Sequence, residues 1–312
     1  MLLFGQGIQG RPLEELWLDG ELPTEADRAA GRSLAARMGE FEGLRPFSTV
    51  VHQLIDYIGR PEFKIERVRE MIESDPALAV RIMRVANSAA FRAYEPCTSI
   101  GKAVMRIGAS NVVHLSMAMA VMSFFKDLGG VGLRVRDHSV GTGAVARELA
   151  FRMGRSAISS QVLLAGLLHD IGKMLMIQTG DIGYAALVNE DYSPHTVHRK
   201  EIQRLGFDHA MLGGHVLKIW NLPDPLPQIV ACHHQLKPTL GKSLPFASAI
   251  SILRMADGID YLLARSRDPE PEELKSLAIS PDGMRAGLQE DTLIELWDDL
   301  RAARAEAHSL FK

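Results

Sequence analysis

The residues with the clearest chemical potential lie in one short stretch, Leu167-Leu168-His169-Asp170-Ile171-Gly172-Lys173. An imidazole and a carboxylate stand side by side there, at the end of an apolar run, 162–168, that is typical of a buried helix. An unpaired buried carboxylate costs several kcal/mol or gives up its charge. A divalent metal would satisfy both side chains, although an isolated His-Asp pair is more often satisfied by backbone and neighbouring side chains.

Two residues after this pair shape the expected local structure. Gly172 can supply the left-handed residue that ends the helix. Lys173 then stands where it could meet an anion such as a phosphate, or pair with a surface acid. We therefore consider Asp170 and Lys173 as candidate catalytic residues.

Further candidate ligands gather in the same half of the chain, because eight of the 11 histidines lie between His138 and His234. The candidate ligands among them fall at expected helix ends, and Asp257 interrupts an apolar helix, where a buried carboxylate requires a partner. Imidazole and carboxylate ligands suit iron, manganese or zinc. We expect one or two such ions, and two would make hydroxide at neutral pH and hold a phosphoester. The candidate metal ligands are His138, His169, Asp170, His209, His233, His234 and Asp257.

Several residues near these candidates have simpler interpretations. His209 could lie in the first turn of a helix that Asp208 caps. Cys232 is interpreted as a buried thiol, and the Gly141-Thr142-Gly143 triplet as a site of close helix packing. The remaining histidines of this region are interpreted as surface or packing residues; they are His195, His198 and His215.

Composition limits the classes of partner and compartment. The chain has 312 residues, of which 46% are hydrophobic and 23% charged, as in ordinary globular proteins. A net charge of −3 argues against a dominant phosphate-binding surface, so we expect no nucleic-acid partner. Two cysteines are too few for a disulfide framework and favour a reduced, cytoplasmic setting. The N-terminus lacks a signal-peptide pattern and the apolar runs are too short to span a bilayer, so no membrane association is expected.

The elements that must position these residues read as helices throughout, without strand alternation. Ser48, Asp75 before Pro76, Ser99 and Asp208 are typical helix starts. A helix is expected over 137–153, with His138 at its start. We predict an all-α, two-lobed protein. Its expected parts are an N-terminal helical extension (1–43), an N-terminal lobe (44–128), a metal-site lobe (129–268) and a C-terminal helical tail (269–312).

The candidate ligands also carry a resemblance. His138, the His169-Asp170 pair and Asp257 resemble the H…HD…D signature of the HD-domain metal-dependent phosphohydrolases. The finer match is to the HDOD family of mostly bacterial signalling proteins, over about residues 44–264. It is carried by several motifs in order: Glu73-Ser74-Asp75-Pro76-Ala77-Leu78, Arg84-Val85-Ala86-Asn87-Ser88-Ala89, Leu205-Gly206-Phe207-Asp208-His209-Ala210, Trp220-Asn221-Leu222-Pro223 and Cys232-His233-His234.

The resemblance has implications for a signalling role as well as for a catalytic one. It implies an all-α protein, and many HDOD members have lost metal ligands and work as signalling or scaffold modules. The ligands kept here are similar to the two-metal set of the HD-GYP cyclic di-GMP phosphodiesterases. However, Gln235-Leu236-Lys237-Pro238 follows His234, without an acidic residue or an Asp-Gly-x-Gly-Tyr-Pro segment, and Arg134 stands where a third metal would want a carboxylate. These departures argue against cyclic di-GMP hydrolysis and leave metal binding open.

Two classes of function remain. The preferred one is a signalling module, non-catalytic or weakly catalytic, that acts through contacts with signalling proteins and uses metal as a structural or sensing element. The alternative is a metal-dependent phosphohydrolase acting on a nucleotide or another phosphoester, with Lys173 steadying negative charge. DNA binding by the N-terminal arginines ranks lower because no recognition-helix signature accompanies them. The sequence leaves the oligomeric state open.

Overall fold

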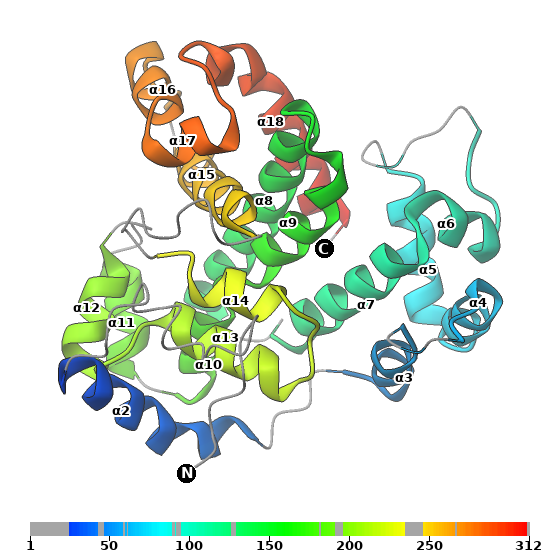
Figure 1. Ribbon diagram of the computed structural model, residues 1–312, viewed down its shortest axis with the longest axis horizontal. Coiled ribbons are helices and arrows are strands. Elements are labelled where there is room, and N and C mark those ends of the chain that lie inside the picture. Colours follow the sequence, from blue (N-terminus) through cyan, green and yellow to red (C-terminus); the bar gives the residue numbers. More distant parts are fainter. Residues whose placement is uncertain are drawn as a thin grey trace. The chain divides into compact units, whose positions relative to one another are not determined.

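The computed structural model describes residues 25–42, 47–58, 60, 62–88, 91, 95–125, 129–180, 182–190, 196–234, 246–265 and 267–310. These residues form helices joined by turns and short loops, and no strand occurs among them (Figure 1). The all-α prediction is therefore confirmed. His195 and the segment 235–238 lie outside the described residues.

The helices divide between two compact units, each described here by itself. The first unit comprises Met1–Leu44 and Phe125–Arg304, so the residues expected to form a metal-site lobe and most of the expected tail belong to one unit. The second unit comprises Arg45–Phe124 and Ala305–Lys312.

The described residues of the second unit form five helices and the end of α18 (Thr292–Leu310). Three of the expected helix starts are found here: Asp75 accepts a hydrogen bond from the Leu78 N–H (3.0 Å), Ser99 from the Lys102 N–H (3.3 Å) and Ser48 from the Val51 N–H (3.4 Å). The helices are α3 (Thr49–Ile58), α4 (Ile65–Glu73), α5 (Pro76–Ala86), α6 (Ile100–Ile107) and α7 (Ala109–Phe124).

The first unit is built around three helices that pack on one another. Helices α8 (Gly129–Arg152), α9 (Ser156–Leu168) and α15 (Ala247–Leu263) each pack on the other two. Glycines allow the close approach of α8 and α9: a Cβ on Gly166 would lie 2.5 Å from the Gly143 Cα, and one on Gly143 would lie 2.8 Å from the Leu163 carbonyl oxygen. The packing interpretation of the Gly141-Thr142-Gly143 triplet fits this geometry.

Further helices pack around this group. Among them, α10 (Ile171–Gln178) packs on α13 (His209–Ile219), α13 packs on α14 (Leu226–Ala231), and α2 (Glu25–Glu42) packs on both α12 (Val197–Leu205) and α13. The other helices among the described residues of this unit are α11 (Ile182–Glu190), α16 (Pro271–Ala278), α17 (Pro281–Ala286) and most of α18 (Thr292–Leu310).

Two local predictions in this unit are wrong. Helix α8 begins at Gly129 rather than near Asp137, so His138 lies within the helix and not at its start. Gly172 does not end a helix in a left-handed conformation; it lies in the first turn of α10. A Cβ there would lie 2.0 Å from the His209 carbonyl oxygen, so Gly172 is required for the close approach of α10 and α13.

One helical stretch within the described residues, Ser156–Gln178, has the length and apolar composition of a membrane span. However, 83% of its most apolar window is buried inside the protein, as in the core helix of a globular unit. A second candidate, Ile100–Ile107 with Ala109–Ser123, qualifies only if a pair bent by 102° counts as one span. Neither stretch is more than a weak indication of a membrane span.

Candidate metal centre

Helices α8 and α15 place two carboxylates around the ring of His138. Asp257 and Asp260 are three residues apart on α15 and therefore share one face of that helix. Asp257 Oδ1 lies 3.0 Å from His138 Nε2, and Asp260 Oδ2 lies 2.8 Å from His138 Nδ1. All three side chains are buried. The apolar helix therefore carries carboxylates because they face an imidazole, one at each ring nitrogen.

The junction between α9 and α10 positions the His-Asp pair. The Nδ1–H of His169 donates to the Gly166 carbonyl oxygen (2.8 Å), which turns its Nε2 towards Asp170, 3.4 Å from the Oδ1 atom. Lys173 donates from Nζ to Asp170 Oδ2 (2.8 Å) and is itself buried. The partner of Lys173 in this structure is thus a buried carboxylate.

The start of α13 adds a third imidazole, and α12 holds it in place. The Nδ1–H of His209 donates to Glu201 Oε2 (2.6 Å), whose other oxygen accepts from the Tyr184 hydroxyl (2.7 Å). The His209 Nε2 atom lies 3.1 Å from Asp170 Oδ1. The expected cap is also present, since Asp208 accepts from the Met211 N–H (2.8 Å). His209 therefore lies in a capped first turn and also faces the cluster.

The end of α14 brings in the last two predicted ligands. The Nδ1–H of His233 donates to the Val230 carbonyl oxygen (2.6 Å), and the His233 ring centroid lies 5.1 Å from that of His169. The Nε2 atom of His234 lies 3.0 Å from that of His209. His198 stacks on His234 with centroids 4.5 Å apart and an interplanar angle of 9°.

Residues from five different elements thus meet at one place. Their potential ligand atoms fall into two groups, one of His138, His169 and Asp170 and one of His209, His233 and His234; within each group these atoms lie within 4.8 Å of one another. Asp170 lies beside both groups, since its Oδ1 atom is 3.1 Å from His209 Nε2. Asp257 joins the first group through His138. The structure therefore brings together all seven predicted metal ligands.

The hydrogen bonding of this cluster fits a metal ion. Among the buried side-chain atoms that make no hydrogen bond are His169 Nε2 and His233 Nε2, both of which face the cluster. A buried polar atom without a partner is costly, and a divalent cation would satisfy both. In addition, His138, His169, His209 and His233 each direct Nδ1 to an oxygen outside the cluster, which is how metal-binding imidazoles are usually oriented.

Electrostatics divide the imidazoles into two kinds. Burial holds the pKa of His233 and of His234 well below the ordinary imidazole value, so both imidazoles are neutral and suited to coordinate a metal. Burial also lowers the pKa of His138, but hydrogen bonds to Asp257 and Asp260 outweigh it and raise that pKa to about 10. Burial lowers the pKa of His209, but attraction to Glu201 and the hydrogen bonds to Asp170 and Glu201 together outweigh it and raise that pKa to about 9. A metal would displace these two protons on binding.

The two candidate catalytic residues stabilise each other's charge. Burial would raise the pKa of Asp170, but the charges of His169 and Lys173 hold it well below the ordinary carboxyl value. Burial would lower the pKa of Lys173, but attraction to Asp170 raises it instead. The pair is therefore charged in the metal-free protein.

Four residues that support the cluster were not found from the sequence. Asp260 carried a usable signal, because it lies three residues after Asp257 in an apolar helix. Glu201 and Arg304, which donates to Asp260, gave no signal in the sequence, since each lies in a charged stretch that resembles an exposed helix face. His198 was assigned to the surface or to packing; it is buried and packs on the His234 ring. His215 is a packing residue that donates to the Met211 carbonyl oxygen (2.9 Å).

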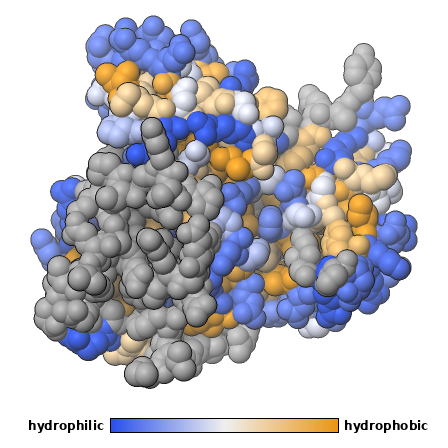
Figure 2. Space-filling model, in the orientation of Figure 1, coloured by the Kyte–Doolittle hydropathy of each residue, from blue (hydrophilic) through white to orange (hydrophobic). Residues whose placement is uncertain are grey.

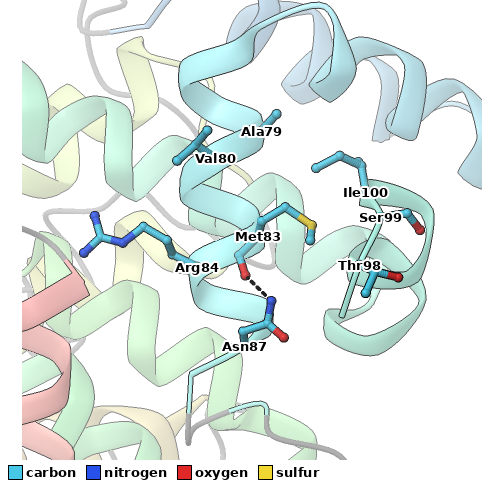
Figure 3. Close-up of a pocket in the computed structure, with 8 residues that line it drawn as sticks. All are labelled: Ala79, Val80, Met83, Arg84, Asn87, Thr98, Ser99 and Ile100. Atoms are coloured by element: carbon cyan, nitrogen blue, oxygen red, sulfur yellow. Dashed lines mark hydrogen bonds between the residues drawn. The ribbon is translucent and has the colours of Figure 1, made fainter. Parts of the chain in front are cut away.

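The second unit contains a groove of about 520 Å³ beside α5 and the start of α6 (Figure 3). Its polar groups are engaged within the unit: Asn87 donates to the Met83 carbonyl oxygen (3.1 Å) and Arg84 to that of Ser309 (2.7 Å). Hydrophobic residues reach the surface of this unit between charged ones (Figure 2), and Val80 is 61% exposed. The groove is lined by Ala79, Val80, Met83, Arg84, Asn87, Thr98, Ser99 and Ile100.

Comparison with known proteins gives the same assignment as the motifs. The family model of the HDOD domain matches residues 44–236, which is more than half of the chain. The chain belongs to the HDOD family. The family model ends before α15, so Asp257 and Asp260 lie beyond the matched residues.

Solved structures support the fold of this HDOD protein. An HDOD domain protein of unknown function from Geobacter sulfurreducens is 23% identical, with a TM-score of 0.70 over 91% of this chain and 98% of that one. A proposed phosphohydrolase from Shewanella amazonensis SB2B is 22% identical, with a TM-score of 0.68 over 90% and 98%. A proposed signal transduction protein from Marinobacter aquaeolei VT8 is 18% identical, with a TM-score of 0.65 over 93% and 66%. At these identities the likeness shows the fold alone.

One relative was found by sequence. An uncharacterized protein of Treponema pallidum (strain Nichols) is 23% identical over 238 residues, which cover 75% of this chain. The match spans only 45% of that relative's own length.

Proposed function

We propose that this HDOD protein is a signal-transduction module that holds one or two divalent metal ions and acts through contacts with signalling proteins. The observation that carries the proposal is the cluster of seven potential ligands in which His169 Nε2 and His233 Nε2 have no hydrogen-bond partner. Burying so many polar and charged side chains costs free energy unless they are paired. A cation is the partner that suits both imidazole and carboxylate.

The residues divide naturally between two ions. His138, His169, Asp170 and Asp257 would hold one, and His209, His233 and His234, with Asp170, would hold the other. Nitrogen and carboxylate ligands without a thiolate suit iron, manganese or zinc. When bound, such ions supply Lewis acidity and lower the pKa of coordinated water.

Burial favours a structural or sensing role for the metal over turnover. Six of the seven ligands are buried, and only His234 is partly exposed. Lys173, which could hold a phosphate or pair with an acid, is 5% exposed and hydrogen bonded to Asp170. A phosphoester would have to displace that contact in order to use Lys173. In the metal-bound protein, the site would stabilise one arrangement of helices that a partner protein recognises.

The metal content of the purified full chain tests this proposal. We expect one or two equivalents of iron, manganese or zinc per chain after growth with these metals, and a loss of most of this metal in Asp170→Asn. Asp75→Asn, at the cap of α5 in the second unit, is the matched control and should retain the metal. Folded wild-type protein that contains no metal and takes up none of the three ions would contradict the proposal.

A metal-dependent phosphohydrolase acting on a nucleotide or another phosphoester is the second candidate. It is favoured by the position of Asp170 beside both ligand groups, which is the place of a shared ligand in a two-metal site. In that case Asp170 would orient the ions, and Lys173 would hold negative charge near them. Bis(4-nitrophenyl) phosphate with added manganese is a simple probe. Turnover by the wild type that disappears in folded Asp170→Asn would favour this candidate, and metal-loaded protein without turnover would favour the signalling role.

A further inference from the structure

We propose that helix α18 is coupled to the metal centre through Arg304 and Asp260, so that metal binding and docking of α18 stabilise each other. The inference rests on the proposed metal site. It assigns Asp260 and Arg304 as positioning residues, which act on the metal through His138. It also gives the charged C-terminal helix a role beyond packing.

The contacts form a continuous series. His138 lies between Asp257 and Asp260, and the Asp260 carboxylate contacts its Nδ1 atom through Oδ2 (2.8 Å). The other oxygen of Asp260, Oδ1, accepts a hydrogen bond from Arg304 Nε (2.6 Å). The Asp260 side chain is 1% exposed, whereas that of Arg304 is 24% exposed. The series therefore runs from a buried candidate ligand to a helix that faces solvent.

A glycine makes room for this pair. Gly141 lies three residues after His138 on α8 and thus on the same face of the helix. A Cβ on Gly141 would lie 1.8 Å from Asp260 Oδ1 and 3.1 Å from Arg304 Nε. No side chain larger than hydrogen fits there while the pair is in place. The site is therefore shaped to admit a carboxylate and a guanidinium behind His138.

Such a pair governs how well the imidazole binds a metal. A carboxylate that accepts the Nδ1–H of a ligand fixes the ring orientation and leaves Nε2 for the ion, and loss of such partners typically costs about 10–100-fold in metal affinity. Arg304 neutralises Asp260, which would otherwise be a buried carboxylate with one partner fewer. Because linkage is reciprocal, a metal that depends on Arg304 must also strengthen the docking of α18.

The same helix offers a matched control. Arg301, one turn before Arg304, pairs with Asp268 at the surface, where the two side chains are 48% and 70% exposed. Removing this exposed pair should leave the metal centre unchanged. Arg301→Gln and Arg304→Gln therefore make the same chemical change on the same helix, at different distances from His138.

Two measurements on the full-length protein test the coupling. Competition between the protein and a chelator for manganese or zinc should show metal affinity up to about 10-fold lower in Arg304→Gln and in Gly141→Ala, and unchanged in Arg301→Gln. The expected loss lies at the low end of the range for second-layer partners because Arg304 contacts Asp260 and not His138 itself. Hydrogen exchange of the wild type should slow around Arg304 on metal addition, relative to α16 in the same unit. This second measurement needs no variant and holds even where a substitution prevents folding.

The outcomes separate this inference from the proposed function. If the wild type binds metal but folded Arg304→Gln binds it equally well, or if metal leaves exchange around Arg304 unchanged, the coupling is wrong and the metal site stands. If the wild type binds no metal, both are wrong.

Discussion

The two compact units differ in what they bury. In the second unit, the buried polar side chains of the described residues are two serines, Ser88 and Ser116. Their hydroxyls donate to the backbone carbonyl oxygens of Val85 and Val112, three and four residues earlier in the chain. In the first unit the buried side chains include five histidines of the cluster region, three aspartates that contact them, Glu201 and Lys173. Both units also bury apolar side chains, which form their cores.

This difference shows where each unit's sequence is constrained by something other than packing. Apolar burial stabilises a core at about 25 cal/mol per Å², whereas burial of ionisable groups is costly unless they are paired. The second unit is therefore explained by ordinary helix packing and caps. The first unit carries a concentration of charge that only mutual pairing, or a bound cation, makes tolerable.

The largest predicted contrast concerns the cations of two ion pairs. Lys173→Met should destabilise the metal-free protein by about 3–5 kcal/mol, because the buried Asp170 carboxylate loses its ammonium partner and keeps only the neighbouring imidazoles. Arg67→Met in the second unit breaks an exposed pair with Glu70 and should cost less than about 1 kcal/mol. Urea unfolding in the presence of a chelator measures both.

The same pair of variants also reports on the metal. Adding manganese or zinc should offset part of the loss in Lys173→Met, because a divalent ion would stabilise the Asp170 charge in place of the ammonium group. It should leave the effect of Arg67→Met unchanged. Equal losses in the two variants would show that the buried charge of the first unit is not the constraint we infer.

Substitutions of two helical glycines, one in each unit, should change the stability of the protein in opposite directions. Gly172→Ala should destabilise the protein by about 1–3 kcal/mol, because a Cβ would lie 2.0 Å from the His209 carbonyl oxygen and the backbone would have to shift. Gly101→Ala, in α6 of the second unit, meets no atom closer than 3.5 Å and should stabilise it by about 0.4–1 kcal/mol. Thermal unfolding of both variants provides the comparison, and a stable Gly172→Ala would refute the close approach of α10 and α13.

These contrasts also explain what the sequence could and could not predict. Asp75, Ser99 and Asp208 were identified as caps because capping is local and depends on a few adjacent residues. Asp257 was identified because a carboxylate in an apolar helix must have a partner. The identity of that partner was less accessible, because His138 and Asp257 are 119 residues apart in the chain.

The supporting residues required the tertiary structure. Glu201 and Arg304 lie in helices whose charged sequences resemble solvated surfaces, and only packing brings them to His209 and Asp260. The role of Gly172 also could not be read locally, because the atom that it must avoid belongs to α13. The early start of α8 was not predicted because Gly129, Gly130 and Gly132 are poor helix formers, whereas the structure has a helix there.

The smallest predicted effect belongs to the second unit. Asp75→Ala should cost about 1 kcal/mol, within the 0.5–2 kcal/mol typical of a lost cap, because the Leu78 N–H loses its acceptor. Chemical denaturation measures this cost. The metal content should not change, since the cap lies in the unit without candidate ligands; a change in metal content would show that the second unit also contributes to the site.

Metal content is the most direct test of the central claim that the buried charges of the first unit form a metal centre. Elemental analysis of the folded full-length chain, grown with iron, manganese and zinc, should give one or two equivalents per chain. His169→Ala should lower this value, whereas His52→Ala, in the second unit, should not. Wild-type protein that is folded, metal-free and unable to take up any of the three ions would contradict the account.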